Sequence, residues 1–243
     1  MSLGRGKLAK YRLLAKSRSL RSALPRTKSM CKEHFYTMLR RYGNVIVKPS
    51  SGSGGVGVIR VRRSSGSGYE VRYGKAVKRC GDLQGAYRLV RSKTASRGHI
   101  VQRTVELAKV AGMPFDIRVM VQRKAGRSWT VTGKLAKIAG PGYIITNVAR
   151  SKGRVASLSE AIRRSNIRCR SAEALQARID SIGLCAARRM QRHYRTRTLG
   201  LDVAVTPSGK VWIIEANLHP SRSLFRKLAD KSMYRRIMAW HKR

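Results

Sequence analysis

Apolar residues along this chain follow two different spacings, which predict alternating groups of strands and helices. Strand-like runs are bounded by glycine, proline and serine, and helical runs carry apolar residues three or four positions apart. The predicted strands cover residues 45–48, 58–61, 69–73, 99–105, 115–123, 128–137, 199–205 and 210–217. The predicted helices cover about 29–42, 82–93, 158–165, 171–195 and 224–241, after a basic helical segment within residues 1–24. This grouping is typical of the α+β class.

Local signals set the expected ends of some of these elements. We expect Thr27 or Ser29 to cap the helix that follows, and Gly43 to end it. A four-residue turn at 206–209 joins the last two predicted strands. With this turn, Asp202 would pair with Ile213.

Charge adds a second constraint on the class of protein. The chain contains 54 Lys and Arg residues against 11 Asp and Glu residues, a formal net charge of +43. Such a balance suggests a polyanionic partner such as nucleic acid, an anionic surface or an acidic polymer. Hydrophobic residues make up 42%, which is enough to build a core. No apolar run approaches the roughly 18 residues of a membrane span, and no signal peptide is recognised, so we expect a cytoplasmic protein.

Cysteine and histidine residues do not form a recognisable catalytic or metal motif. The four cysteines lie outside C-x-x-C pairs, and the histidines are scattered, so zinc spacing is absent. We expect the cysteines to be buried, reduced thiols. The H-E-x-x-H and G-x-S-x-G motifs are also missing from the sequence.

A glycine-rich loop at residues 50–57 is the strongest local signal. Glycines let backbone N–H groups approach phosphate oxygens without interference from a Cβ atom. A Walker A loop is excluded because Val58, rather than Lys-Ser/Thr, follows the last glycine. A dinucleotide-binding G-x-G-x-x-G loop is excluded because a strand, rather than a helix, is predicted to follow.

Two interpretations of this loop remain open. A kinase-like flap between two strands fits the local pattern, although the H-R-D and D-F-G motifs of a kinase are missing. The alternative is a flexible Gly/Ser hairpin loop with no ligand. Lys48 favours the phosphate-binding interpretation because its ammonium group ends the preceding strand.

Carboxylates are so few that their positions are informative. Strand alternation around the expected turn puts Asp202, Ile213, Glu215 and Asn217 on one face of a hairpin. Carboxylate and amide oxygens suit Mg²⁺ that is held together with substrate phosphates. Salt bridges to the abundant arginines are the alternative role for these acids.

Taken in order, several segments resemble the ATP-grasp superfamily, and most closely the YheC/YheD-like endospore coat-associated ATP-grasp proteins. The segments are 45–49 with the glycine loop, 101–102, 114–119, 133–137, 145–150 and 200–217. The resemblance implies an ATP-grasp fold of two α+β lobes with the nucleotide between them. It implies a basic helical segment at 1–24, a small lobe with the glycine flap at 25–105, and a large lobe with the metal face at 106–243.

The resemblance also implies roles for individual residues. The flap and Lys48 would contact the phosphates, the backbone at 103–105 the adenine, and Asp116 the ribose. The nucleotide-binding residues would be Lys7, Lys48, Ser53, Gly54, Gly55, Gly57, Gln102, Arg103, Thr104, Val105 and Asp116. The catalytic residues would be Arg118, Lys134, Asn147 and Arg150. Asp202, Glu215 and Asn217 would hold one or two Mg²⁺ ions, with Mn²⁺ as an alternative.

The activity implied by the resemblance is an ATP-dependent carboxylate–amine ligase that acts through an acyl phosphate. Such a reaction needs charge neutralisation and positioning rather than a protein nucleophile. The basic surface suggests an anionic carboxylate acceptor such as an acidic peptide or polymer, and nucleic acid is less favoured.

Three alternatives to this simple picture are kept open. Most of the usual N-terminal substrate domain is not recognised, so a partner chain or homodimer would supply its role, or the acceptor would be a large molecule held by the basic surface, or ligase activity would be lost. The chain would otherwise be a non-catalytic polyanion-binding or spore-coat-associated protein on the same fold. A kinase with a small acceptor is the third reading.

Overall fold

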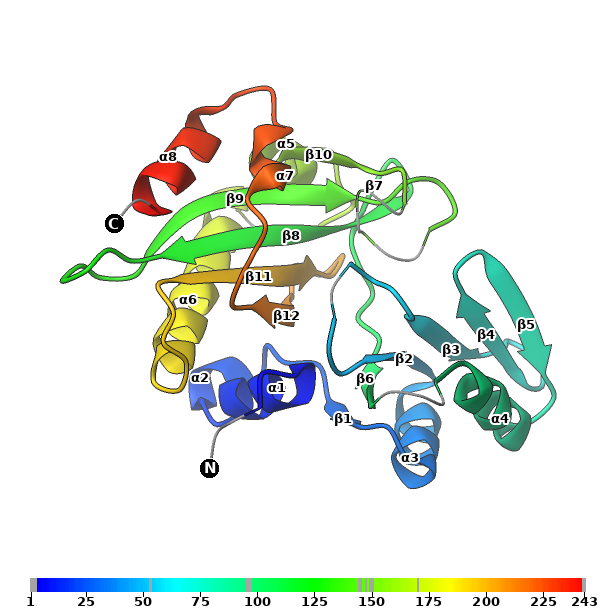
Figure 1. Ribbon diagram of the computed structural model, residues 1–243. Coiled ribbons are helices and arrows are strands. Elements are labelled where there is room, and N and C mark those ends of the chain that lie inside the picture. Colours follow the sequence, from blue (N-terminus) through cyan, green and yellow to red (C-terminus); the bar gives the residue numbers. More distant parts are fainter. Residues whose placement is uncertain are drawn as a thin grey trace. The chain divides into compact units, whose positions relative to one another are not determined.

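The computed structural model describes residues 4–52, 54–94, 98–143, 146, 148, 151–169 and 171–241. The chain forms two compact units (Figure 1). Unit 1 comprises Met1–Tyr11 and Pro25–Thr104, and unit 2 comprises Arg12–Leu24 and Val105–Arg243. The helix α1 (Lys7–Ala15) contains the first point at which the chain passes from one unit to the other.

Unit 1 is built on an antiparallel sheet. Its strand order is β1 (Thr27–Ser29), β6 (His99–Arg103), β2 (Asn44–Pro49), β3 (Ile59–Arg63), β4 (Tyr69–Tyr73) and β5 (Ala76–Cys80). The helices α3 (Lys32–Tyr42) and α4 (Leu83–Thr94) both pack against this sheet.

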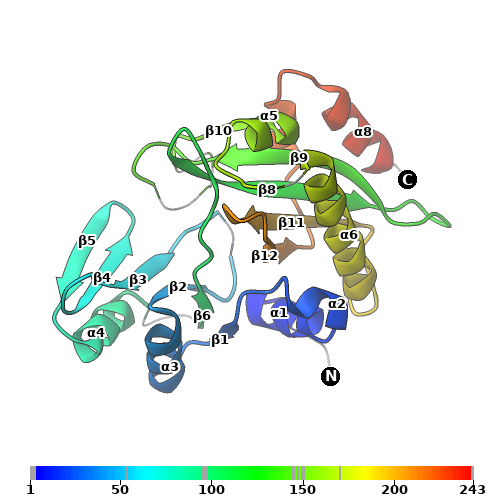
Figure 2. The same ribbon diagram turned by 180° about the vertical axis from the view of Figure 1, so that it is seen from behind.

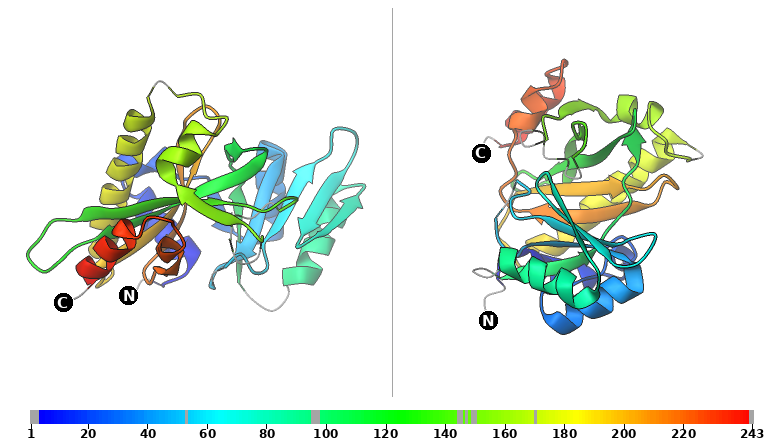
Figure 3. Two further views of the ribbon diagram at one scale, coloured as in Figure 1. Left: turned by 90° about the horizontal axis from the view of Figure 1, so that it is seen from above. Right: turned by 90° about the vertical axis from the view of Figure 1, so that its right-hand side faces the viewer.

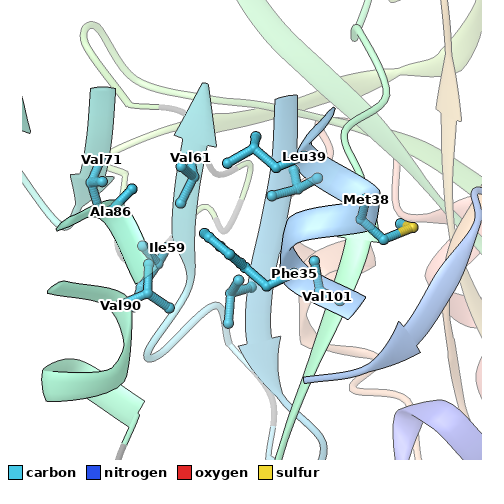
Figure 4. Close-up of a cluster of buried hydrophobic side chains, with 11 residues drawn as sticks. Phe35, Met38, Leu39, Ile59, Val61, Val71, Ala86, Val90 and Val101 are labelled. Atoms are coloured by element: carbon cyan, nitrogen blue, oxygen red, sulfur yellow. The ribbon is translucent and has the colours of Figure 1, made fainter. Parts of the chain in front are cut away.

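Strand alternation gives unit 1 one apolar face and one polar face. Side chains from α3, α4 and alternate strand positions interlock in a core cluster, in which Phe35 contributes the largest side chain (Figure 4). The residues between them on the strands, such as Lys48 on β2 and Gln102 on β6, therefore point to the other face. The core cluster consists of Phe35, Met38, Leu39, Val45, Val47, Ile59, Val61, Val71, Ala86, Val90 and Val101.

Unit 2 contains a second antiparallel sheet. Its order is β10 (Arg154–Ser157), β9 (Thr130–Ile138), β8 (Met113–Gln122), β11 (Thr198–Val205) and β12 (Val211–Asn217), and β7 (Lys109–Val110) pairs with β8. The helices of this unit are α2 (Arg18–Arg21), α5 (Leu158–Arg163), α6 (Ala172–Gln191), α7 (Ser223–Arg226) and α8 (Ser232–His241).

Helices lie on both faces of the unit 2 sheet, with α6 and α8 on opposite sides (Figures 2 and 3). Gly183 of α6 lets this helix approach Val119 and Val121 on β8. On the other face, Met120 and Leu135 pack with Phe225 of α7 and Ile237 of α8. The end of that second face beyond the α7–α8 contact carries charged side chains.

Two predicted helices have different limits in the structure. The helix predicted from residue 29 begins at Lys32, because residues 27–29 instead pair with β6 as β1. Cys31 is its N-cap, and its Sγ accepts a hydrogen bond from the His34 N–H. The helix predicted at 224–241 is two helices, because an Asp230 carboxylate oxygen accepts the Ser232 N–H at 2.8 Å and starts α8 there.

The prediction that the cysteines are buried is wrong. Cys31 and Cys169 are exposed, Cys80 and Cys185 are half-buried, and all four are free thiols. The capping role of Cys31 explains its position at the surface, because helix ends need polar partners there. Among the residues that the structure describes, no helix is both long and apolar enough to span a membrane.

We predict that Gly133→Ala destabilises unit 2. An added Cβ on β9 would lie 2.8 Å from Ile237 Cδ1 and 2.9 Å from Phe225 Cε1. Such overpacking lowers the free energy of unfolding by about 1–3 kcal/mol. Urea unfolding followed by tryptophan fluorescence measures this, because Trp129, Trp212 and Trp240 all belong to unit 2.

Gly183→Ala is the matched control for this substitution. Its added Cβ would meet its nearest neighbour, Val121 Cγ2, at 3.3 Å, and alanine has the higher helix propensity. A Gly133→Ala variant as stable as Gly183→Ala would contradict the packing described for α7 and α8.

Candidate functional site

The charged end of the unit 2 sheet is built by the pairing of three strands. Asp116 and Arg118 are two positions apart on β8, so they share a face. Lys137 of β9 lies directly opposite Asp116, and Asp202 of β11 lies directly opposite Arg118. We call these four residues the charged cluster.

Contacts within the charged cluster are short and form a continuous network. Arg118 donates from Nε to Asp202 Oδ1 at 2.9 Å and from Nη2 to Oδ2 at 3.3 Å. Lys137 Nζ lies 2.8 Å from Asp202 Oδ1 and 3.1 Å from Asp116 Oδ1. Thr146 donates its hydroxyl to Asp116 Oδ2 at 2.6 Å. Lys137 therefore bridges the two aspartates.

Burial and charge pull the ionisation of this cluster in opposite directions. Burial raises the pKa of Asp116, and it outweighs the lowering effect of Lys137. Burial would also raise the pKa of Asp202, but Lys137 and Arg118 outweigh it and hold that pKa well below its usual value. Burial opposes the charge on Lys137, yet Asp116 and Asp202 raise its pKa. Asp202 is the carboxylate most firmly kept ionised.

The neighbouring hairpin has a different register from the predicted one. Asp202 does not pair with Ile213, because the connection is one residue longer than expected and Val205 pairs with Val211. A β-bulge then makes Asp202 pair with Glu215, so Ile214 is the extra residue. Ile213 lies opposite Val203 and is buried on the other face.

Two shifts in register nevertheless leave the predicted oxygen donors together. Asp202, Glu215 and Asn217 share a face, because the longer turn and the bulge each move the pairing by one residue. Asn217 Nδ2 donates to Asp202 Oδ2 at 3.4 Å. Glu215 and Asn217 are half-buried at the rim of the charged cluster.

The donor set suits a divalent cation that also binds phosphates. Two carboxylates and one amide oxygen are the hard ligands that Mg²⁺ prefers, and such sites use few protein ligands. With Glu215, the site brings three carboxyl groups close to the positive charges of Lys137 and Arg118. In the described part of the chain, no three His, Cys, Asp or Glu residues converge as a ready metal cage. Asp202 would have to share its oxygens between the metal and its present partners.

Lys134 is not brought to the charged cluster. It is three positions before Lys137 on β9, so it points to the opposite face. There its Nζ pairs with Asp180 of α6 at 2.8 Å from Oδ1 and 2.9 Å from Oδ2. Lys137 was not among the site residues predicted from the sequence. The signal was a lysine between Ala136 and Ile138, since a charge in an apolar strand requires an acidic partner.

Lys48 is held on the polar face of the unit 1 sheet. Its Nζ donates to Gln102 Oε1 at 2.8 Å, and Gln102 Nε2 donates to Thr27 Oγ1 at 2.8 Å. Lys48 is 7% exposed and Gln102 is 6% exposed, so both are desolvated yet hydrogen-bonded. The structure therefore brings together two of the predicted nucleotide-binding residues and fixes the direction of the ammonium group.

The glycine loop follows Lys48 and has the backbone that only glycine readily adopts. Gly52, Gly54, Gly55 and Gly57 all have positive φ angles, between 69° and 85°. Lys7 reaches this loop from α1, where its Nζ donates to the Gly52 carbonyl at 2.6 Å. The predicted lysine at the start of the chain thus lies beside the loop.

The remaining predicted residues are less informative. The backbone N–H groups of Arg103 and Thr104 are already bonded to the Arg26 and Asn44 carbonyls. Val105 is half-buried and begins the second segment of unit 2. The predicted residues Ser53, Asn147 and Arg150 lie outside the described residues.

We predict that Asp202→Asn destabilises the protein at pH 7. Arg118 and Lys137 would lose their shared counter-charge in a buried setting, which costs about 3–5 kcal/mol of unfolding free energy. Urea unfolding at several pH values measures the loss. The surface pair Glu160–Arg164, in which Arg164 is exposed and Glu160 half-buried, supplies the control Glu160→Gln, for which little change is expected.

The pH dependence of this difference has a definite sign. The pKa of Asp202 is lower in the folded state, so its stabilising contribution is present above the unfolded pKa of about 3.9 and is lost as the pH falls further. The difference between wild type and Asp202→Asn should therefore be largest near neutral pH and shrink below about pH 4. An undiminished difference in acid would contradict the ionic role of Asp202.

Comparisons with known proteins identify relatives from a spore-forming bacterium. The chain is 29% identical over 197 residues to the endospore coat-associated protein YheD of Bacillus subtilis (strain 168), covering 76% of this chain and 41% of the relative. It is 23% identical over 194 residues to YheC of the same organism, covering 78% of this chain and 52% of the relative. The chain thus spans about half the length of these relatives.

Solved structures agree on the fold. D-alanyl-alanine synthetase A from Vibrio cholerae has a TM-score of 0.56 at 10% identity, covering 96% of this chain and 62% of the synthetase. The ATP-grasp ligase PsnB, complexed with a minimal precursor, Mg and ADP, has a TM-score of 0.51 at 15% identity, covering 97% and 58%. The fold is the ATP-grasp fold. The YheC/D-like ATP-grasp family matches residues 2–240, and the chain belongs to this family.

Proposed function

We propose that this protein binds Mg-ATP and is an ATP-dependent ligase. The observation that carries the proposal is the charged cluster, in which Lys137 bridges two buried aspartates beside the Glu215–Asn217 rim. A buried network of this kind is costly to maintain, and perturbed ionisable groups concentrate at functional sites. The ATP-grasp ligase PsnB, which has a similar fold and is complexed with Mg and ADP, adds support.

In this proposal, unit 1 binds the nucleotide phosphates. Lys48 is already desolvated and directed by Gln102, so little ordering is needed for its ammonium group to meet a phosphate. The glycine loop offers backbone N–H groups with no Cβ in the way, and Lys7 lies beside it. The glycine loop follows Lys48 directly in the chain, so the lysine and the loop could bind the same phosphate group.

Unit 2 supplies the metal ligands and the charge for the reacting groups. Asp202, Glu215 and Asn217 would hold one or two Mg²⁺ ions, which neutralise charge on the phosphate oxygens. Arg118 and Lys137 keep Asp202 ionised, and the charge of Glu215 also stabilises the charged form of Arg118. Asp116 would have two roles: it holds Lys137 in place through their ion pair, and it would contact the ribose.

The proposed reaction forms a carbon–nitrogen bond through an acyl phosphate. A carboxylate oxygen of the acceptor attacks the γ-phosphorus of ATP, the bond to the β-phosphate oxygen breaks, and ADP leaves. An amine then attacks the acyl carbon, a proton is lost, and inorganic phosphate leaves. Arg118 suits the acceptor carboxylate or the transferring phosphoryl group because its guanidinium can bind two oxygens at once.

The acceptor and the location of the protein are part of the same proposal. The net charge of +43 favours an anionic acceptor such as an acidic peptide. Both relatives are described as endospore coat-associated proteins, and we propose an association with the spore for this chain. Mn²⁺ would be expected to replace Mg²⁺, because it accepts the same oxygen ligands.

We predict that Glu215→Gln abolishes Mg-dependent turnover while the protein stays folded. Glu215 is half-buried at the rim, so the substitution removes the negative charge of a proposed metal ligand without creating a cavity in the core. The assay measures phosphate release from ATP and product mass with a panel of amino acids and acidic peptides. Glu160→Gln, a half-buried carboxylate on α5, is the control and should keep full activity.

The same assay separates the competing functions. A ligase releases phosphate and forms a product that is heavier by the joined amine, whereas a kinase transfers the phosphate to the acceptor. Turnover that Glu215→Gln leaves unchanged, or no Mg-ATP binding by the wild type, would rule out the proposed site.

We predict that substituting Lys137 weakens Mg-ATP binding, whereas substituting Lys134 on the same strand has little effect. Lys137→Gln should lose Mg-ATP binding by at least about tenfold, equivalent to about 1.4 kcal/mol, because the cluster loses its bridging charge. Lys134→Gln should bind almost as well as the wild type, since its partner is Asp180 on the other face. Isothermal titration with Mg-ATP measures both, and circular dichroism checks folding. A larger loss for Lys134→Gln would favour the role first expected for that residue.

A further inference from the structure

A second charged surface lies on the polar face of unit 1. Strand pairing puts Arg60 opposite Arg72 and Arg62 opposite Glu70, and Glu70 opposite Arg79. On β3 and β4 these residues alternate with core residues, and Arg79 of β5 lies opposite Glu70, so the five share the face away from the core cluster. We call them the arginine face.

Positive charge on the arginine face is only partly neutralised. Glu70 is its only acid, and it pairs with Arg60 Nη2 at 3.4 Å and with Arg62 Nη2 at 3.2 Å. Arg60 and Arg72 are like charges directly opposite each other, an arrangement that destabilises a sheet. Four arginines against one glutamate leave three positive charges on a few strand positions.

Two of these guanidinium groups also have an Nε donor without a hydrogen-bond partner in the described part of the chain. The Nε atoms of Arg60 and Arg72 are buried and have none among the described residues. Burial lowers the pKa of Arg60, and the neighbouring arginines lower it further, although Glu70 acts in the opposite direction. Buried donors without partners are costly. An anion at this position would satisfy the donors and neutralise the repulsion.

Chemical features of the surrounding face favour an acidic polypeptide over a nucleic acid. Single-stranded nucleic acids bind through bases stacked on aromatic rings. The tyrosines of β4, Tyr69 and Tyr73, instead pack against the core cluster on the opposite face. Val77, which pairs with Arg72, is 43% exposed and offers an apolar contact to a side-chain stem.

The spacing of the arginines also fits an extended acidic chain. Alternate side chains of an extended peptide lie about 7 Å apart on one face, which is the spacing of Arg60 and Arg62 along β3.

We propose that the arginine face is a docking site for an acidic, extended polypeptide, whose carboxylates bind Arg60, Arg62, Arg72 and Arg79. Arginine suits this role because its planar group binds a carboxylate with two parallel hydrogen bonds. The peptide would bring the acceptor carboxylate to the ligase, a link that rests on the proposed function. The docking itself requires neither nucleotide nor metal.

The test measures binding of a fluorescein-labelled decaglutamate peptide by fluorescence anisotropy, without ATP. The double variant Arg72→Gln/Arg79→Gln should weaken binding at least tenfold. The control Arg178→Gln/Arg188→Gln removes the same charge from exposed positions on α6 and should change the affinity less than twofold. Circular dichroism checks whether both variants are folded.

A third variant gives a change in the opposite direction. Glu70→Gln removes the carboxylate that competes for Arg60 and Arg62, so decaglutamate should bind several-fold more tightly. Loss of structure alone would not produce tighter binding, so this variant also covers the case in which the double variant fails to fold.

Three results would overturn the proposal. They are equal losses in the two double variants, weaker binding by Glu70→Gln, or decathymidylate binding more tightly than decaglutamate with the same sensitivity to Arg72 and Arg79. The peptide-binding test contains no nucleotide, so its result can be interpreted even if the ligase assay shows no activity. Likewise, a negative peptide-binding result would not contradict the proposed nucleotide site.

Discussion

The ionic bridge that Lys137 makes between Asp116 and Asp202 is the interaction on which the unit 2 site depends. Two carboxylates at this depth would each favour the protonated form. Lys137 and Arg118 outweigh burial at Asp202, whereas burial prevails at Asp116. The cluster therefore presents one firmly ionised carboxylate beside one whose proton is held more tightly. That asymmetry comes from the order of side chains across three neighbouring strands.

In both units, one face of the sheet packs against helices and the other face carries the charged and polar side chains. In unit 1, α3 and α4 bury alternate strand residues, while Lys48, Gln102 and the arginine face occupy the other positions. In unit 2, α6 covers one face, and α7 with α8 covers only part of the other. Apolar packing on one side gives the polar side a rigid support, which keeps charged groups oriented.

Much of the fold could be predicted from the sequence, because the strands alternate strongly and the helices are amphipathic. The α+β class, the glycine loop between two strands and the sharing of a face by Asp202, Glu215 and Asn217 were accessible in this way, whereas the ATP-grasp fold came from the resemblance of several ordered segments to that superfamily. The shared face was predicted for an incomplete reason, since the turn and the bulge each shift the register by one residue. Lys137 was missed because the orientation of β9 depends on its partners on β8, which periodicity within one strand does not reveal.

The β-bulge at Ile214 has a consequence for the fidelity of folding. If Ile214 paired regularly with Asp202, Glu215 would turn toward the face where Leu201 and Val203 are fully buried. Placing a carboxylate there would cost several kcal/mol, because it would have no partner. The apolar packing on one face of the sheet therefore disfavours the regular register, because that register would bury the Glu215 carboxylate. This free-energy cost keeps the oxygen donors of Asp202, Glu215 and Asn217 together on the other face.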